Sequence, residues 1–185
     1  FLTPLLTSVS KKYPEITIRI ISTNKISDLK RQEADVSIRL AFKVEDDVVG
    51  RRLCRCVLGA FASPDYLAEH SDLTIGDGGK AHWIGWGSNN TWVKDTPFPN
   101  ASIRHHLPDI QTQLEAAAAG LGMAWVPCFL GDKHKGLCRI PDVPVVPSRS
   151  IWLLLHGDLR NSARVRAFVD HTAREILARK SEFTT

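Results

Sequence analysis

The sequence predicts an α/β fold in which helices cover a sheet, and three features of residues 109–127 support this. Asp109 can N-cap a helix whose apolar residues recur at helical spacing. Gly120 is the residue type that most readily adopts the left-handed end of a helix. Gly122 then leads into a short apolar strand, which Pro127 stops. A helix, a glycine hinge and a buried strand so close together exclude an all-β sandwich and a helical bundle.

Composition limits the classes of function. The chain has 185 residues and is 43% hydrophobic, enough for one domain or two small ones. Its 24 Lys and Arg residues exceed its 20 Asp and Glu residues only slightly, and they are spread along the chain. A nucleic-acid groove usually has a denser basic stripe, so we do not expect this polypeptide itself to grip DNA. No apolar run approaches the roughly 20 residues that span a membrane, so we expect no membrane association.

The start of the chain and its cysteines indicate its context. Phe1 lies inside an apolar run with neither an initiator methionine nor a signal-like leader, so we expect a fragment of a longer protein. Cys54 and Cys56 are two residues apart and share a strand face, which is poor placement for a mutual disulfide. Reduced thiols predict a cytoplasmic protein. The sequence has neither a C-x2-C nor an H-x3-H pair, so we expect no metal and no cofactor.

The first third of the chain predicts a helix followed by a β-α-β unit. Apolar residues from Phe1 to Val9 form a helical stripe that Tyr13-Pro14 closes. Residues 16–21 alternate as a strand, residues 26–33 form a short helix, and residues 34–40 form the next strand. A β-α-β order predicts parallel pairing through a right-handed crossover.

The rest of the chain predicts a second lobe and a return to the first. Ser63-Pro64-Asp65 follows the strand at 53–61 and starts a helix, with a capping residue and then proline at the first helical position. The other expected elements are strands at 82–87, 102–107, 123–126 and 151–156, a helix at 162–179, and loops at 88–100 and 132–150. This order predicts one lobe of residues 1–57 plus 151–185 and another of residues 58–150. The chain would cross between them near 56–62 and 148–153.

Five segments carry a family resemblance. They are LTPLLTSVSKKYPEITIRI (2–20), EADVSIRL (33–40), LGAFASPDYLAEH (58–70), LEAAAAGLGMAWVP (114–127) and WLLLHGDLRNSARVRAFVDHTAREIL (152–177). In this order they resemble the effector-binding (regulatory) domain of LysR-type transcriptional regulators. The resemblance implies a type II periplasmic-binding-protein fold, with two Rossmann-like subdomains joined by two crossover strands around a cleft. It also implies that a first strand and an N-terminal helix-turn-helix precede Phe1.

The implied cleft gives two groups of candidate effector-binding residues, and the first lies in the first lobe. Ser22, Thr23 and Asn24 follow a predicted strand, where their side chains can bind a carboxylate or merely cap the next helix. Arg39 has a guanidinium that suits a carboxylate bidentately, or it forms a salt bridge with Asp35.

The second group lies in the second lobe. Gly87 would let a ligand approach the backbone, and Ser88 offers a donor. Trp86 can stack on an aromatic ligand or belong to the core. By resemblance, His105 is a candidate effector contact, although a histidine here can also serve packing or the surface. Asp109 either borders this site or only caps its helix.

The function that these observations predict is ligand sensing. A small effector, carboxylate or aromatic, would shift the balance between two lobe arrangements in a homodimer or homotetramer that binds DNA only through the missing N-terminal domain. A solute-binding protein of the same fold is the alternative. An enzyme is a third possibility, but the sequence has no G-x-S-x-G, no P-loop and no acidic pair on one helical face, so we expect no catalytic residues.

Overall fold

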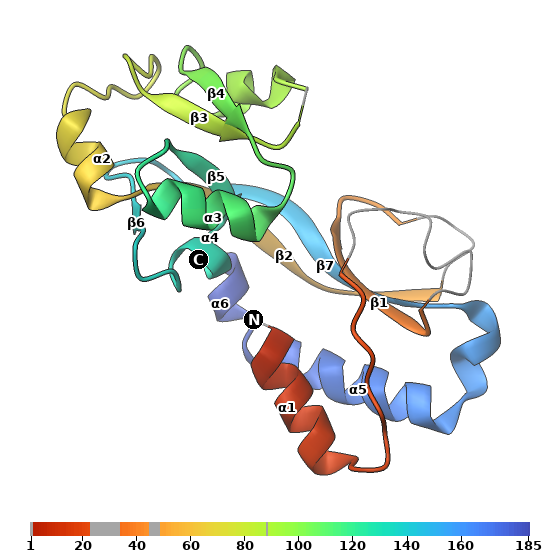
Figure 1. Ribbon diagram of the computed structural model, residues 1–185. Helices are drawn as coiled ribbons and strands as arrows, with labels where there is room; N and C mark the ends of the chain where they lie inside the picture. The colour runs from red at the N-terminus through yellow and green to blue at the C-terminus, as the bar shows by residue number, and fades with distance from the viewer. Residues whose placement is uncertain (1, 23–33, 45–48, 88) are drawn as a thin grey trace. The chain divides into compact units, whose positions relative to one another are not determined.

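The computed structural model describes residues 2–22, 34–44, 49–87 and 89–185, which contain both helices and strands (Figure 1). They divide into two compact units. Unit 1 comprises residues 1–56 and 148–184, and unit 2 comprises residues 57–147 with Thr185. Strands β2 (Val49–Ala62) and β7 (Val146–Leu155) contribute residues to both units.

Two packed helices form one layer of unit 1. Helix α1 (Leu2–Lys12) confirms the predicted apolar stripe, because Leu5 and Val9 are buried. It lies beside α5 (Ala163–Ala178), as Figure 1 shows. A hydrogen bond of 2.8 Å joins Ser8 Oγ to His171 Nε2 between the two helices. Helix α5 confirms the helix predicted at 162–179, and it is flanked by the short helices η3 (Gly157–Asn161) and α6 (Ser181–Thr184).

The strands of unit 1 pair in an antiparallel manner. Strand β1 (Val36–Ala41) pairs with β7 from Val36 opposite Leu155 to Ala41 opposite Ser150. Strand order is β1-β7-β2 on this side of the sheet. Side chains reinforce the neighbouring strands, because Arg52 Nε donates to Ser150 Oγ at 2.8 Å.

Two expectations for the start of the chain are wrong. Residues 16–22 belong to no strand, and Ile20 is 64% exposed. The partner of β1 is β7, antiparallel, so the expected parallel β-α-β pairing is absent from the described residues. Alternating apolar residues favour an extended backbone, but a strand also requires a hydrogen-bonding neighbour. The helix expected at 26–33 lies outside the described residues.

Unit 2 contains an antiparallel part and a parallel part. Strand β2 pairs antiparallel with β5 (Ala124–Pro127) and β6 (Cys138–Arg139). Strands β3 (His82–Gly85) and β4 (Ser102–His106) pair in parallel. The helices of this unit are α2 (Pro64–Glu69), η2 (Thr91–Asp95), α3 (Ile110–Ala118) and α4 (Cys128–Gly131). The segments expected to be loops, 88–100 and 132–150, thus hold η2, β6 and the start of β7.

The predicted helix caps of unit 2 are confirmed. Ser63 Oγ accepts a hydrogen bond from Tyr66 N at 3.2 Å at the start of α2. Asp109 Oδ1 accepts one from Thr112 N at 2.9 Å at the start of α3. Gly120, with a φ of +81°, ends α3. Leu121 N donates to Ala116 O and Gly120 N to Ala117 O, both at 3.0 Å, which is the Schellman pattern.

This end of α3 gives a prediction for stability. A Cβ at Gly120 would come no closer than 3.7 Å to its neighbour, Ser63 Oγ, so Gly120→Ala adds backbone strain without a steric clash. We expect a loss of about 1–2 kcal/mol in the free energy of unfolding, measured by urea denaturation. Gly120→Asn should lose less, because asparagine tolerates the left-handed region better. Equal stability of all three proteins would contradict this explanation of the helix end.

The core of unit 2 consists of apolar clusters, and one of them centres on Trp83. This side chain is fully buried, and its ring lies 5.7–6.1 Å from the rings of Trp92, Phe98 and Trp125. A second cluster includes Phe61, Ile84 and Leu114. These large side chains come from the parallel strand β3, from the antiparallel strands β2 and β5, and from helices. Their packing therefore holds the parallel strands against the rest of the unit.

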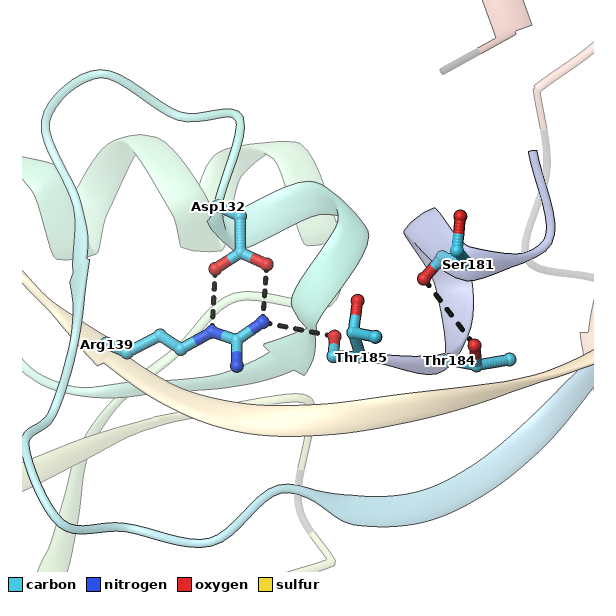
Figure 2. Close-up of polar contacts among 5 residues, drawn as sticks. All are labelled: Asp132, Arg139, Ser181, Thr184 and Thr185. Atoms are coloured by element: carbon cyan, nitrogen blue, oxygen red, sulfur yellow. Dashed lines mark hydrogen bonds and ion pairs between the residues drawn. The ribbon is translucent and has the colours of Figure 1, made fainter.

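A bidentate ion pair connects Asp132, the residue that follows α4, to β6. Figure 2 shows both carboxylate oxygens of Asp132 facing the guanidinium of Arg139, at 2.7 Å from Nε and 2.6 Å from Nη2. The same Nη2 donates to Thr185 O at 3.1 Å. Donation of hydrogen bonds to Asp132 raises the pKa of Arg139. Both side chains are about 40% exposed, so we expect this pair to contribute little to stability.

All four cysteines lie in the described part of the chain, and none forms a disulfide. Cys54 and Cys56 are both buried in β2. A hydrogen bond between their side chains lowers the pKa of Cys54 and raises that of Cys56. Burial raises the pKa of Cys128 to about 11. Two of the four thiols, those of Cys56 and Cys128, are therefore held more strongly in the protonated form than an exposed cysteine.

Candidate functional site

The candidate site in unit 2 is the edge where β3 and β4 end. The two strands run parallel, with Ile84 opposite His105 and Gly85 opposite His106. Parallel strands end at the same edge of a sheet, which is where α/β proteins commonly bind ligands. The chain continues from β3 into Trp86 and Gly87, so these residues and His105 share this edge.

Gly87 lies beside open space. A Cβ built on this residue would meet no described heavy atom within 4 Å. Its carbonyl oxygen accepts a hydrogen bond of 2.6 Å from His106 Nδ1, which therefore carries the proton. This bond fixes the segment after β3 to the end of β4. The backbone at Gly87 is thus held in place while its Cα side remains open for a ligand.

Trp86 and His105 have polar and aromatic groups near the same edge. Trp86 is 36% exposed, unlike the fully buried Trp83 of the same segment, so part of its ring is available for contact. His105 is half-buried. The register of the two strands shifts between Ile103 and His105, so that His105 lies opposite Ile84 and not on the face of Ile103. The residues that flank His105, Arg104 and His106, are exposed.

Several basic side chains lie near the imidazole of His82 in these strands. Burial lowers the pKa of His82 in β3, and the nearby charges of Arg104, His70 and His105 lower it further. The imidazole of His82 shares a hydrogen bond of 2.7 Å with Ser102 Oγ. His82 and Ser102 are the first residues of β3 and β4, so this interaction lies at the opposite end of the strands from Trp86 and Gly87.

Asp109 acts as the cap of α3. Its carboxylate accepts hydrogen bonds from Thr112 N and from Thr112 Oγ1, at 2.9 and 3.0 Å. The bond from the Thr112 backbone is the main reason that the pKa of Asp109 is lowered. The helix N-terminus therefore already has a negative charge, and we do not assign an effector carboxylate to it.

Gln113 supports this edge, and the sequence reasoning missed it. The side chain is fully buried in α3. Its Nε2 donates to Leu107 O at 2.5 Å and lies 3.5 Å from Gly85 O, so it connects the ends of both strands. Its Oε1 is buried without a hydrogen-bond partner among the described residues. The spacing along the helix could have predicted its burial, because Gln113 lies three residues after Ile110 and four before Ala117, on the apolar face of α3.

The remaining candidates fall in unit 1 or outside the described residues. Ser22 is exposed at the end of the unpaired segment 16–22. Arg39 is half-buried in β1, opposite Trp152 of β7. Thr23, Asn24 and Ser88 lie outside the described residues. The structure therefore brings together Trp86, Gly87 and His105 in unit 2, whereas Ser22 and Arg39 belong to unit 1.

Among the described residues, we found no group of three or more His, Cys, Asp or Glu side chains that could hold a metal ion. Within the same residues, none of the helices combines the length and the apolarity needed to cross a membrane.

The fold and this strand-end site define a two-unit α/β binding domain, and its family is shown by comparison. Residues 1–176 match the family described as "LysR substrate binding domain". The chain belongs to this family, as its sequence segments indicated, and is an effector-binding domain of the LysR type.

The similar curated proteins are transcriptional regulators. The regulator CrgA of Neisseria meningitidis is 23% identical over 188 residues, which cover 95% of this chain and 62% of that protein. PtxR of Pseudomonas aeruginosa is 24% identical over 181 residues, which cover 92% of this chain and 58% of that protein. The chain thus spans about three fifths of the length of these regulators.

Solved structures show the same fold. The CrgA regulatory domain has a TM-score of 0.79 at 19% identity, covering 95% of this chain and 91% of that one. The effector domain of AmpR of Pseudomonas aeruginosa has a TM-score of 0.78 at 20% identity, covering 98% and 90%. These similarities confirm the type II periplasmic-binding-protein fold that the resemblance implied.

Proposed function

We propose that the chain is the sensing domain of a bacterial transcription regulator and binds a small-molecule effector at the β3–β4 edge. Membership of the LysR substrate binding domain family supports this, as does the naming of its relatives as regulators rather than enzymes. DNA binding through a separate N-terminal domain, assembly into a homodimer or homotetramer and a cytoplasmic location are parts of the same proposal, and so is the absence of catalysis.

The observation that carries the proposal is the open space at Gly87, at the strand edge to which Trp86 and His105 also belong. An aromatic or otherwise unsaturated effector would place its flat body against the exposed part of Trp86. A polar atom of the effector would bond to His105. We do not assign a carboxylate of the effector to the start of α3, because Asp109 already places a negative charge there. In unit 1, Arg39 and Ser22 remain candidate contacts predicted from the sequence. Thr23, Asn24 and Ser88 are candidates too, and they lie outside the described residues.

The effector would act by changing the balance between two arrangements of the protein. Binding energy alone does not switch a regulator, because a ligand with equal affinity for both arrangements shifts nothing. Gln113 and the His106–Gly87 hydrogen bond hold the strand ends of this edge in place, so the difference in affinity would have to come from the other contacts of the effector. Those other contacts of the effector would form in only one of the two arrangements.

Substitution of Gly87 tests the proposal. Gly87→Leu fills the open space, so we expect the affinity for an effector to fall at least about tenfold. The free energy of unfolding should change by less than about 0.5 kcal/mol, because a Cβ at this position has no described atom within 4 Å. The measurement is calorimetry with metabolites that raise the melting temperature of the chain. Gly157→Leu is the matched control, since its Cβ position in unit 1 is equally open.

Two outcomes would contradict the proposal. Unchanged affinity in Gly87→Leu would remove the effector from this edge. A metabolite that binds the chain but leaves operator occupancy of the full-length protein unchanged would not be its effector. A true effector should change that occupancy, measured by a mobility-shift titration at fixed salt.

A further inference from the structure

A pocket lies in unit 1, whereas the β3–β4 edge belongs to unit 2. It has a volume of about 500 Å³. Its lining consists of Arg51 from β2 and of Asp170, Arg174, Leu177 and Ala178 from α5. The four α5 residues recur at helical spacing, so they form one face of that helix. The pocket therefore lies between one helix face and one strand.

The charges of this pocket are available to a ligand. Among the described residues, no ion pair involves Arg51, Asp170 or Arg174. All three side chains belong to exposed residues. Two guanidinium groups can hold a carboxylate by several parallel hydrogen bonds, and one carboxylate can hold an ammonium group.

The apolar part of the lining adds a third requirement. Leu177 is half-buried, and together with Ala178 it forms the last turn of α5. The C-terminal end of a helix has a partial negative charge, which disfavours a purely anionic ligand and favours a positive group. A ligand that fits must therefore combine a carboxylate, a cation and an apolar part.

We propose that this pocket binds a free α-amino acid. Its carboxylate would lie on Arg51 and Arg174, its ammonium group on Asp170, and its side chain against Leu177 and Ala178. This zwitterion satisfies all three features of the lining at once, whereas a simple carboxylate leaves Asp170 unpaired and a simple amine leaves both guanidinium groups unpaired. The site is independent of the effector edge proposed above, because each lies in its own unit.

Ligand analogues test the pocket without any substitution. We would titrate the chain with each common L-α-amino acid by calorimetry and take the tightest binder forward. Its analogue without the amino group and its analogue without the carboxylate should each bind at least about tenfold more weakly. No binding by any amino acid at concentrations up to about 10 mM would overturn the proposal. Equal binding of the analogue without the amino group would also overturn it.

Matched variants then locate the binding. Arg174→Gln and Asp170→Asn should each weaken the amino acid at least about tenfold. Asp170→Asn should not weaken the analogue without the amino group, because that analogue has no ammonium group to lose its partner and its carboxylate would meet one negative charge less. Arg164→Gln is the control, as Arg164 is an exposed arginine of the same helix outside the lining. Circular dichroism would verify that each variant is folded.

The two proposals fail separately. Gly87→Leu should leave amino-acid binding at the α5 pocket unchanged. If Gly87→Leu abolished this binding while Arg174→Gln preserved it, the amino acid would belong to the β3–β4 edge, and the proposal of a second site would be wrong.

Discussion

Trp83→Ala should lower the free energy of unfolding by about 3–5 kcal/mol, the range for removal of a large aromatic side chain from a core. The ring is fully buried among Trp92, Phe98 and Trp125, so alanine would leave a cavity lined by aromatic groups. It would also remove the hydrogen bond of 3.2 Å from Trp83 Nε1 to Phe98 O. Urea denaturation followed by circular dichroism measures the loss.

Trp86→Ala is the matched control for this prediction. The two tryptophans are three residues apart, but Trp86 is 36% exposed and its removal should cost less than about 1 kcal/mol. The same variant should weaken an aromatic effector, because it removes the proposed stacking surface. Equal losses of stability in Trp83→Ala and Trp86→Ala would contradict the prediction that the buried tryptophan contributes more to stability than the exposed one.

Gln113→Glu should give the second large effect, a loss of about 3–5 kcal/mol at pH 8. The glutamate would have nearly the shape of glutamine, but its charge would be buried beside Leu107 O and Gly85 O. Burial and the neighbouring carbonyl oxygens would both raise the pKa of this carboxyl above its value in the unfolded chain.

The sign of the pH dependence follows from that shift. A raised pKa means that the folded state binds the proton more tightly, so the protonated variant can still donate to Leu107 O. The loss should therefore be smallest below the unfolded pKa of about 4.3 and should grow as the pH rises through the folded pKa. Gln113→Leu has a similar size but no titrating group, so its loss of about 1–3 kcal/mol relative to the unsubstituted protein should not change with pH. Parallel pH profiles for the two variants would contradict this account of Gln113.

Local signals predicted many of the elements. Ser63 and Asp109 were identified as caps because a capping side chain acts within three residues of itself. Gly120 was identified as a helix end for the same reason. The apolar stripes of α1 and α5 were visible because a helix repeats every 3.6 residues. Their boundaries in the structure differ from the predicted ones by only one or two residues.

The candidate site was predictable in part. Trp86, Gly87 and His105 follow or end strands, and strand ends can be found from sequence. Gln113 was missed because a polar side chain in a helix gives no sign of its burial until its partners are known. The bond from His106 to Gly87 was missed because it joins residues 19 positions apart.

The sequence by itself determined the family, the α/β class and the helix caps of this protein. The tertiary structure decided which strands pair, since β1 takes β7 as its antiparallel neighbour, with Val36 opposite Leu155. It also decided that residues 16–22 belong to no strand despite their alternating pattern. The physical reason is range: caps and helical stripes depend on neighbours within a few residues, whereas strand pairing and the burial of a glutamine depend on partners far along the chain.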